Sequence, residues 1–262
     1  MLELRKLLVA TAAMMSLWLC HASVAVSDDL AAIKADKRVR IGAVEAPPWY
    51  TRDQPGEHWQ GLVPEVMTAV FSGTDIRIEY VETQWGTAVE GLRSGQFDLI
   101  GAYNATPERR RAIDFSVPMG QLRFSILTLR KPAPDYSTWD SLDLRNLRLG
   151  AVEGAGATVA LQPLLSHLEW VKVPTSDAMF KLLDDGLADA LVTSDIQIAQ
   201  YLDQHGKGQM SVPAPIRGQP TNIGLRQAPD PTLRKWLDAR LAALKADGTL
   251  DHIWSKYTAS AN

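Results

Sequence analysis

The stretch RSGQFDLIGAYN, residues 93–104, ends a predicted helix at its glycine and then continues into an apolar, strand-like run. The stretch DDGLADALVTSD, residues 184–195, repeats this order of charged residues, glycine, aspartate and apolar strand. Each is preceded in the chain by another matching strand, RIGAV at residues 40–44 and RLGAV at residues 148–152. Two sets of the same elements predict two similar α/β lobes with a crevice between them.

From residue 39 onward, strand-like and helix-like segments alternate. Apolar runs and period-2 patterns predict strands over residues 39–44, 76–81, 97–102, 124–129, 147–152, 170–173, 190–193 and 221–225. Helical spacing predicts helices over residues 62–71, 88–94, 157–165, 178–184, 196–204, 233–246 and 250–257, and Thr106 and Pro107 open a further short helix. The alternation predicts parallel sheets flanked by helices, with ligands bound beyond the carboxyl ends of the strands.

The N-terminal segment has the pattern of a secretory signal peptide. Arg5 and Lys6 precede an apolar run of 13 residues, 7–19, and residues 23–25 (SVA) offer small side chains for cleavage. The run is shorter than the roughly 20 apolar residues of a membrane-spanning helix. We therefore predict a signal peptide over residues 1–25, cleaved near Ala25, and a periplasmic protein. The alternative is an uncleaved N-terminal anchor.

The charge and cysteine content argue against several kinds of site. The whole chain carries −3 and the predicted signal +1, so the mature form carries about −4, which gives no footprint for nucleic acid. Cys20, the only cysteine, lies in the predicted signal, so no disulfide and no thiol chemistry are expected in the mature chain. The five histidines are scattered without metal-ligand spacing. We expect no metal and no cofactor.

Seven blocks of sequence carry, in their order and spacing, a resemblance to a known family. They are VRIGAVEAPPWY (39–50), GLVPEVMTAVF (61–71), WGTAVEGLRSGQFDLI (85–100), NATPERRRAIDFSVP (104–118), LGAVEGAGAT (149–158), LLDDGLADALVTSD (182–195) and NIGLRQAPDPTLRKWLDARLAALKADGTLDHIWSKY (222–257). Together they resemble the periplasmic solute-binding proteins, family 3, of polar amino-acid ABC transporters.

This resemblance implies the type II periplasmic binding protein fold. Such a fold has two α/β lobes, each a mainly parallel sheet flanked by helices, joined by two crossover strands. We place the crossings near Arg123 and Pro220. Lobe one is then expected over residues 28–122 plus 221–262, with both ends of the mature chain, and lobe two over residues 123–220.

Arg109 is the residue that the resemblance marks most strongly. The family pattern places an arginine after Thr-Pro-Glu to grip the ligand's carboxylate, and a guanidinium pairs both carboxylate oxygens. From the residues alone, the alternative is a solvated charged face at residues 109–111. Relatives often have a ligand-binding serine or threonine where this chain has Asn104. Ala102 is expected on the same strand-to-helix turn, and Tyr103 points either into the cleft or back into lobe one.

Aromatic residues are expected against the ligand on the lobe-one side. Trp85 matches a position where relatives place an aromatic beside the ligand's side chain, and Trp49 and Tyr50 follow the first strand, where another aromatic commonly lines the site. Ordinary core packing is the alternative for all three. Glu45 follows the same strand, and we expect it to face the cleft.

The lobe-two half of the site departs from the family pattern. Relatives often have Gly-Thr-Thr or Gly-Ser-Thr, but here Gly156 occupies the hydroxyl position and Thr158 is displaced. Backbone amides can still form an anion-binding nest. Relatives also hold the α-amino group with an aspartate directly after the strand, whereas here Ser194 intervenes before Asp195. Asp195 either serves from its shifted position or is a helix N-cap; without it, the ligand is not an ordinary α-amino acid.

The resemblance implies a monomeric, non-catalytic receptor that captures a small solute bearing a carboxylate, such as an amino acid, for an ABC transporter permease in the inner membrane. One alternative is an enzyme on the same fold, similar to cyclohexadienyl dehydratase. Its candidate acid–base groups are Glu45, Glu153 and Asp195. The other alternative is a sensory or accessory binding module.

Overall fold

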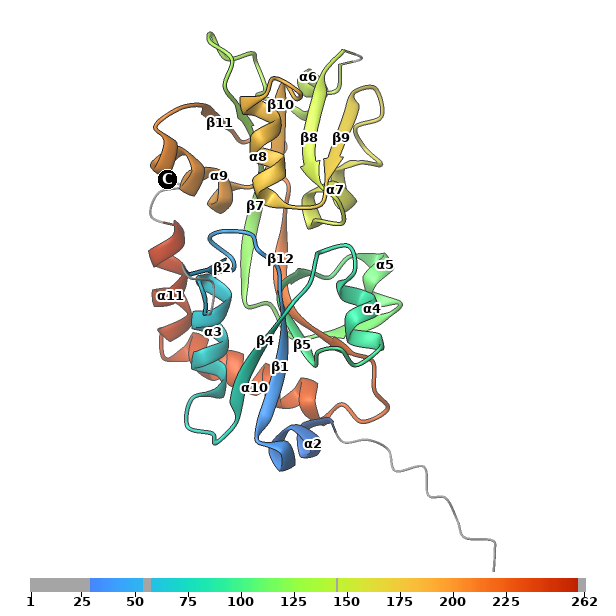
Figure 1. Ribbon diagram of the computed structural model, residues 1–262, viewed down its shortest axis with the longest axis vertical. Helices are drawn as coiled ribbons and strands as arrows, with labels where there is room; N and C mark the ends of the chain where they lie inside the picture. The colour runs from blue at the N-terminus through green and yellow to red at the C-terminus, as the bar shows by residue number, and fades with distance from the viewer. Residues whose placement is uncertain (1–28, 54–57, 145, 259–262) are drawn as a thin grey trace, which may run out of the picture.

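The computed structural model describes residues 29–53, 58–144 and 146–258. Figure 1 shows two α/β lobes stacked along the long axis of the molecule, with β7 (Gly120–Thr128) and β12 (Gly218–Arg226) running between them. The predicted two-lobe fold with two crossover strands is therefore confirmed. The predicted signal peptide lies outside the described residues. No helix in the described ranges has both the length and the apolar character needed to cross a membrane.

Lobe one contains both described ends of the chain. Its sheet holds, in spatial order, β4 (Arg77–Glu82), β1 (Arg38–Ala43), β5 (Leu99–Asn104) and β12, with β6 (Ile113–Phe115) also paired to β12. A small ribbon is formed by β2 (Thr51–Arg52) and β3 (Trp59–Gln60). The helices are α2 (Asp29–Asp36), α3 (Leu62–Phe71), α4 (Ala88–Arg93), α5 (Pro107–Arg110), α10 (Thr232–Ala246) and α11 (Thr249–Thr258). The pairs β1–β4 and β1–β5 are parallel, and β12 is antiparallel to β5.

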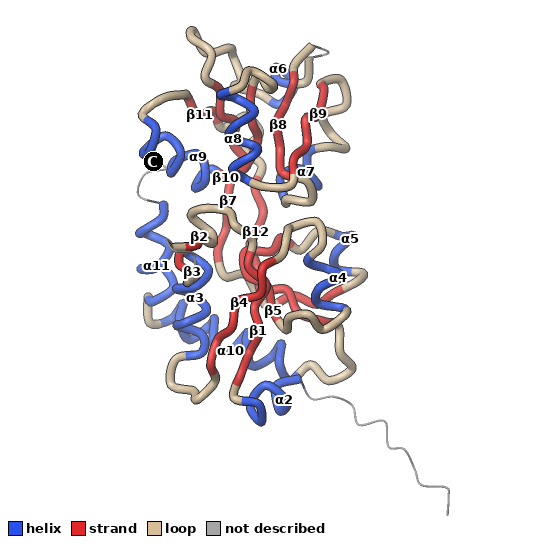
Figure 2. The backbone as a smooth tube through the Cα atoms, viewed as in Figure 1, coloured by secondary structure: helices blue, strands red, loops and turns tan. Residues whose placement is uncertain are grey.

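Lobe two repeats this plan with fewer elements. Its sheet holds β9 (Glu169–Val173), β8 (Arg148–Val152), β10 (Ala190–Ser194) and the second half of β7, to which β11 (Gln209–Ser211) also pairs. Its helices are α6 (Trp139–Leu142), α7 (Gly156–Leu161), α8 (Ser176–Asp184) and α9 (Asp195–His205). The pairs β8–β9 and β8–β10 are parallel, and β7 is antiparallel to β10. Figure 2 shows the two sets of strands end to end.

The two sequence repeats occupy equivalent places. Arg40 binds Asp98 in lobe one through its backbone N–H (2.8 Å) and its Nε (3.3 Å). Arg148 binds Asp189 in lobe two through the same two groups, at 2.9 and 3.2 Å. In both lobes, the residue after the arginine lies beside the residue after the aspartate. The repeated motif therefore fixes the same register between two parallel strands in each lobe.

The crossover strands change partners along their length. The first half of β7 pairs with β12, and its second half, from Phe124 onward, pairs with β10. Within the β7–β12 ladder, Arg123 lies opposite Gly218 and Gln121 lies opposite Pro220. The chain thus enters and leaves lobe two on two neighbouring antiparallel strands, an arrangement suited to hinge bending.

Most predicted elements are confirmed within two or three residues of their predicted ends, but one shift affects the site. The strand predicted over residues 97–102 begins and ends two residues later, because β12 pairs with it as far as Asn104. Ala102 and Asn104 therefore lie at the end of β5 and not on the following turn. Six elements were not predicted from the sequence, and most of them are too short to show a hydrophobic period: α2, α6, β2, β3, β6 and β11.

Candidate functional site

Residues of both lobes enclose a cavity of about 50 Å³ beside the crossover strands. Lobe one and the crossovers contribute Ala46, Trp49, Trp85, Ala102, Tyr103, Asn104, Arg109, Leu122 and Phe124. Lobe two contributes Val152, Ala155, Gly156, Ala157, Ser176, Val192, Thr193, Ser194 and Gln197. Many of these residues lie at or just after the carboxyl ends of β1, β5, β8 and β10, where the sequence analysis expects ligands.

Arg109 is held at this cavity by the short helix α5. Thr106 is its N-cap, and the side-chain oxygen accepts a hydrogen bond from the Arg109 backbone N–H at 3.3 Å. The guanidinium of Arg109 donates to the Asn104 carbonyl at 3.1 Å and, across the gap between the lobes, to the Gly154 carbonyl at 2.5 Å. It also stacks on the Tyr103 ring at 3.7 Å. One side chain thus contacts both lobes.

The charge of Arg109 is buried and forms no ion pair with any described residue. The residue is only 6% exposed, and burial lowers the pKa of its guanidinium. Among the residues that the structure describes, Arg109 makes no ion pair, and its guanidinium donates hydrogen bonds to neutral carbonyls. An arginine keeps its proton even so, and a buried, unpaired charge is unfavourable. The site therefore favours an anion beside Arg109.

Asn104, Ala102 and Gly156 all line the cavity. The Asn104 side-chain amide donates to the Pro220 carbonyl on β12 at 3.0 Å. A Cβ atom added to Gly156 would lie 1.9 Å from Asn104 Oδ1, so the lobes approach closely here because this residue is glycine. Ala102 lines the cavity with a backbone φ of 53°, a conformation that non-glycine residues rarely adopt.

The aromatic side chains divide between the cavity and the core. Trp85 lines the cavity and stacks on Tyr103 with ring centroids 6.1 Å apart. The Tyr103 hydroxyl donates to the Trp85 carbonyl at 2.9 Å, so its ring lines the cavity while its hydroxyl points back into lobe one. Trp49 lines the cavity and donates from Nε1 to Ser194 Oγ in lobe two at 3.3 Å. Tyr50 is fully buried and binds the Gly101 backbone, so it does not line the cavity.

Three other predicted residues also lie outside the lining. The carboxylate of Glu45 accepts from the Arg52 backbone N–H at 3.1 Å instead of facing the cleft. Thr158 donates from Oγ1 to the Val152 carbonyl at 2.6 Å and supports the β8–α7 turn. Asp195 is paired with Arg123 at 2.7 Å. The N-cap interpretation of Asp195 is wrong, because the cap of α9 is Ser194, whose Oγ accepts from the Gln197 N–H at 3.2 Å.

A neutral polar network on lobe two was missed by the sequence analysis. Gln197 donates from Nε2 to Ser176 Oγ at 3.0 Å and accepts from Thr193 Oγ1 at 2.5 Å. Gln197 and Ser176 are both buried and come from the first turns of α9 and α8. A polar side chain just after a helix start was visible in the sequence at both places. Nothing in the sequence showed that the two helix starts converge.

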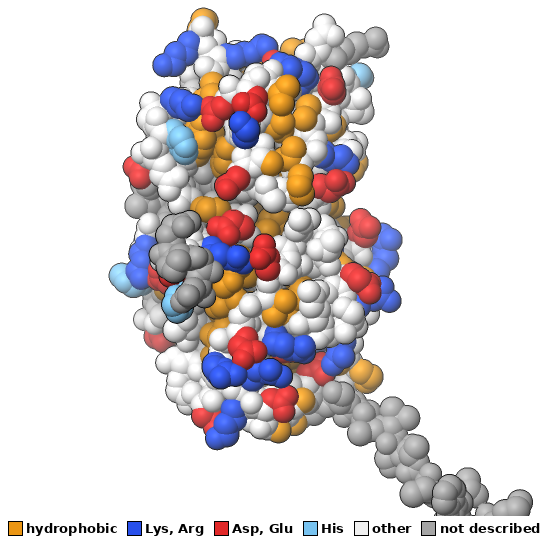
Figure 3. Space-filling view, in the orientation of Figure 1, with side chains coloured by type: hydrophobic (Ala, Val, Ile, Leu, Met, Phe, Trp, Pro, Cys, Tyr) orange, Lys and Arg blue, Asp and Glu red, His pale blue; other side chains and the backbone are white. Residues whose placement is uncertain are grey.

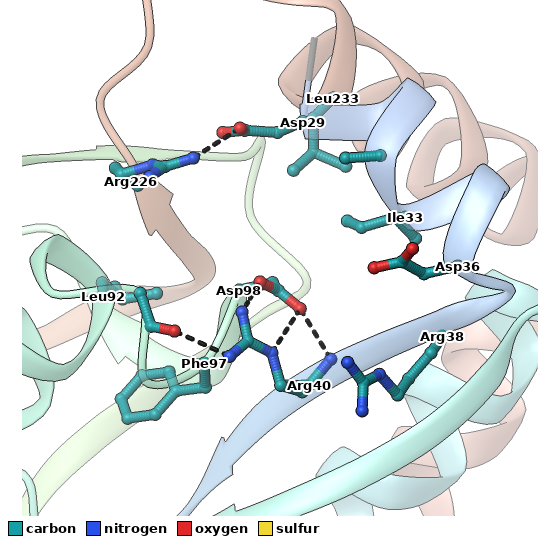
Figure 4. Close-up of a pocket in the computed structure, with 12 residues that line it drawn as sticks. Asp29, Ile33, Asp36, Arg38, Arg40, Leu92, Phe97, Asp98, Arg226 and Leu233 are labelled. Atoms are coloured by element: carbon teal, nitrogen blue, oxygen red, sulfur yellow. Dashed lines mark hydrogen bonds and ion pairs between the residues drawn. The ribbon is translucent and has the colours of Figure 1, made fainter. Parts of the chain in front are cut away.

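A second cavity, of about 180 Å³, lies at the far end of lobe one among α2, β1 and α4. Figure 4 shows two ion pairs in this lining, Arg40 with Asp98 and Arg226 with Asp29, beside the charged side chains of Asp36 and Arg38. Since four of the six charged side chains pair within the lining and all lining residues belong to lobe one, we assign this cavity a structural role. Within the described ranges, no group of three or more histidine, cysteine, aspartate or glutamate side chains is placed to hold a metal ion.

The surface shows no large patch of one charge on the face in Figure 3, where acidic and basic side chains are interspersed over both lobes. Among the described residues that line the interlobe cavity, Arg109 is the only charged one.

Comparisons with known proteins agree with this architecture. A probable amino-acid ABC transporter-binding protein of Haemophilus influenzae is 26% identical over 209 residues, which cover 79% of this chain and 78% of that protein. The virulence sensor protein BvgS of Bordetella bronchiseptica is 27% identical over 181 residues, which cover 68% of this chain but 14% of the sensor. This chain therefore resembles one segment of that much longer sensor.

Among solved structures, an ancestral amino acid-binding protein described as a precursor of cyclohexadienyl dehydratase superposes with a TM-score of 0.79. It is 24% identical, and the match covers 88% of this chain and 99% of that chain. At this identity the likeness shows the fold alone. The family model of the bacterial extracellular solute-binding proteins, family 3, matches residues 39–260. Because this match spans most of the chain, the chain belongs to family 3 of the bacterial extracellular solute-binding proteins.

Proposed function

We propose that the protein is a periplasmic receptor that closes its two lobes over a small solute bearing a carboxylate and delivers it to an ABC transporter permease. We further propose that residues 1–25 are its signal peptide, cleaved near Ala25, that lobe one is residues 28–122 plus 221–262, that lobe two is residues 123–220, and that it acts as a monomer. Relatives whose names include amino-acid-binding proteins support this class of solute.

The buried charge of Arg109 is the observation that carries the proposal. The guanidinium is 6% exposed, borders the interlobe cavity and has no ion-pair partner in the described part of the chain. A carboxylate guest would supply the missing negative charge and accept two parallel hydrogen bonds from the guanidinium. Binding would then remove the cost of an uncompensated buried cation, which gives the guest a large share of its affinity.

The same residues link capture to closure. Arg109 donates to the Gly154 carbonyl and Trp49 donates to Ser194 Oγ, so two side chains of lobe one reach lobe two. A guest held between these groups contacts both lobes at once. It therefore binds the closed arrangement more tightly than an open one, and this difference in affinity shifts the hinge equilibrium toward closure. A permease that recognises the closed form would therefore bind the solute-loaded receptor in preference to the empty one.

The substitution Arg109→Ala tests the assignment. We expect solute affinity to fall more than about 100-fold, or about 3 kcal/mol, because the charge-assisted pair is lost. Isothermal titration calorimetry on the purified mature chain would measure it, with the solute first identified by native mass spectrometry of protein taken from its host. Thermal unfolding of the ligand-free variant should change little, because the lost side chain carries an unpaired charge.

Arg110→Ala is the matched control. Arg110 is the next residue on the same helix, but it is exposed, and its Nε donates only to the Ala105 carbonyl. Its removal should leave affinity unchanged. Undiminished affinity in the Arg109 variant, or an equal loss in both variants, would remove the physical basis of the proposed site.

We propose that this receptor is not an enzyme. The cavity lining in the described part of the chain includes no histidine, aspartate or glutamate to act as a general acid or base. Of the three candidate groups, Glu45 binds Arg52, Glu153 is exposed beside Lys172, and Asp195 is paired with Arg123. Prolonged incubation with the identified solute, followed by mass spectrometry, should return the solute unchanged. A product would establish the enzyme alternative instead.

A further inference from the structure

The described lining of the interlobe cavity contains a positive charge but no negative one. Of the described residues that line it, Arg109 is the only charged one; the other polar side chains are the hydroxyls of Ser176, Thr193 and Ser194, the amides of Asn104 and Gln197, the Tyr103 phenol and the indoles of Trp49 and Trp85. A zwitterionic guest brings one negative and one positive group. The protein offers a full charge to the first group and only neutral atoms to the second.

The polar groups of lobe two already form hydrogen bonds, in which the hydroxyls of Ser176 and Ser194 are acceptors. Gln197 Oε1 accepts from Thr193 at 2.5 Å, and its Nε2 donates to Ser176 at 3.0 Å. Ser194 Oγ accepts from both the Gln197 N–H and Trp49 Nε1. Once it has accepted these bonds, a hydroxyl still carries its own hydrogen to donate. Ser176 and Ser194 therefore offer donors to a guest, which suits an oxygen acceptor better than an ammonium.

Two carboxylates adjoin this network in sequence, and neither is available to a guest. Asp177 is exposed and outside the cavity lining. Asp195 is 6% exposed, and its Oδ2 accepts from Arg123 Nε at 2.7 Å. Its Oδ1 accepts from the backbone N–H groups of Arg123 and Ile196 at 3.2 and 3.0 Å. Asp195 is thus bound to the crossover strand β7 and is not part of the cavity lining. On the lobe-one side, Glu108 is exposed; it lines a neighbouring cavity that Arg109 also borders, and it does not line the first cavity.

From these contacts we infer, on the basis of the proposed function, that the site selects small carboxylates whose α-carbon bears a hydroxyl or keto oxygen over the corresponding α-amino acids. An α-ammonium inside the cavity would lose water and gain no anionic partner, while the Arg109 charge would repel it. An α-oxygen would instead accept from the hydroxyl donors of lobe two.

Matched pairs of acids test the inference on the wild-type mature chain. The pairs are glycolate with glycine, lactate with alanine, and glycerate with serine, each titrated by calorimetry at pH 7. Within at least one pair, we expect the hydroxy acid to bind at least ten-fold more tightly. Equal or tighter binding of the amino acids would overturn this inference and leave the proposed receptor function standing. If no acid of either series binds, the inference falls, and the proposed function is then decided separately by titrating the Arg109→Ala variant with the solute identified by native mass spectrometry.

A gain-of-function variant gives a second readout. Gln197→Glu introduces a carboxylate into the network with little change in side-chain size, and we expect it to shift the preference toward the amino acid of each pair. Gln204→Glu is the control, because it adds the same charge to the same helix at an exposed position outside the cavity. An unchanged preference in a folded Gln197 variant, checked by thermal unfolding, would contradict the assigned role of this network.

Discussion

At Gly156 the two halves of the site approach closely. A methyl group there would lie 1.9 Å from Asn104 Oδ1 and 2.7 Å from Asn104 Cγ. Asn104 is 5% exposed and tied to the Pro220 carbonyl, so it has little room to move away. Gly156 also begins α7, where alanine is a better helix former than glycine. A side chain at this position would therefore disfavour lobe closure without destabilising the fold of lobe two.

We predict that Gly156→Ala hinders closure while each lobe stays folded. Small-angle X-ray scattering should give a larger radius of gyration than the wild type in the presence of saturating solute, and affinity should fall about ten-fold or more, equivalent to about 1.4 kcal/mol. The double variant Gly156→Ala with Asn104→Ala removes the opposing side chain and should close again. Full closure of the single variant would contradict the clash.

Side-chain direction set the limit of what sequence could predict about the site. The sequence identified Arg109, Asn104, Ala102, Trp85, Trp49 and Gly156, all of which line the cavity. It could not show that Tyr50 turns inward to the Gly101 backbone or that Asp195 turns to Arg123, because each has a neighbour one residue away, Trp49 or Ser194, that faces the cavity instead. A shift of one residue along the chain therefore decides whether a side chain lines the cavity or is buried elsewhere in the protein.

Among the elements, the paired strands β8 and β10 depend on one buried carboxylate. Asp189 is 7% exposed and accepts hydrogen bonds from the Arg148 backbone, from the Arg148 side chain and from Arg130 at 2.5 Å. Hydrogen bonds from Arg148, with the nearby charge of Arg130, hold the pKa of Asp189 below its usual value of 3.8. An acid with a lowered pKa in the folded state stabilises the protein above its unfolded pKa and loses this contribution as the pH falls below it.

We therefore predict that Asp189→Asn lowers the unfolding free energy by about 2 kcal/mol at pH 7, as expected for buried, charge-assisted hydrogen bonds. Between pH 5 and pH 3 the wild type should lose stability more steeply than this variant. Urea denaturation at several pH values would measure both effects. Asp185→Asn, which removes an exposed partner of Lys181, should change stability by less than about 0.5 kcal/mol. Parallel pH profiles for the wild type and Asp189→Asn would contradict the assignment.

The same elements show why the fold was more predictable than the site. Each repeat places an arginine at the start of one strand and an aspartate before another, with glycine ending the helix between them. These local signals fix period and polarity, and most predicted elements were confirmed. The ribbon of β2 and β3 has two residues per strand, so it follows from tertiary pairing and leaves no period in the sequence.

At the scale of the whole molecule, closure depends on contacts between side chains of lobe one and groups of lobe two. Trp49 is 4% exposed, donates to Ser194 Oγ and packs edge-on against Trp254 of α11 at 5.8 Å. It therefore connects the C-terminal helix, lobe one and lobe two. Phenylalanine at this position would keep an aromatic ring but lose the hydrogen bond between the lobes.

We predict that Trp49→Phe weakens solute binding about five-fold, because a neutral hydrogen bond contributes about 1 kcal/mol to the closed form. The loss should appear as faster dissociation in stopped-flow measurements, with the association rate little changed. Trp236→Phe is the control, since Trp236 packs on Phe71 within lobe one, with ring centroids 5.1 Å apart, and should leave both rates unchanged. Identical kinetics for the two variants would contradict a role for the Trp49–Ser194 hydrogen bond in closure.

The chain enters and leaves lobe two side by side, with Arg123 opposite Gly218. A segment whose two ends are neighbours is a natural unit for exchange between proteins. Replacing it with its counterpart from a relative would cut the backbone at one place in space. Such a chimera would keep Arg109, the proposed carboxylate anchor, while importing a new set of neutral or charged partners for the remainder of the guest. Recombination of this segment between relatives can therefore change ligand specificity while the carboxylate-binding arginine stays the same.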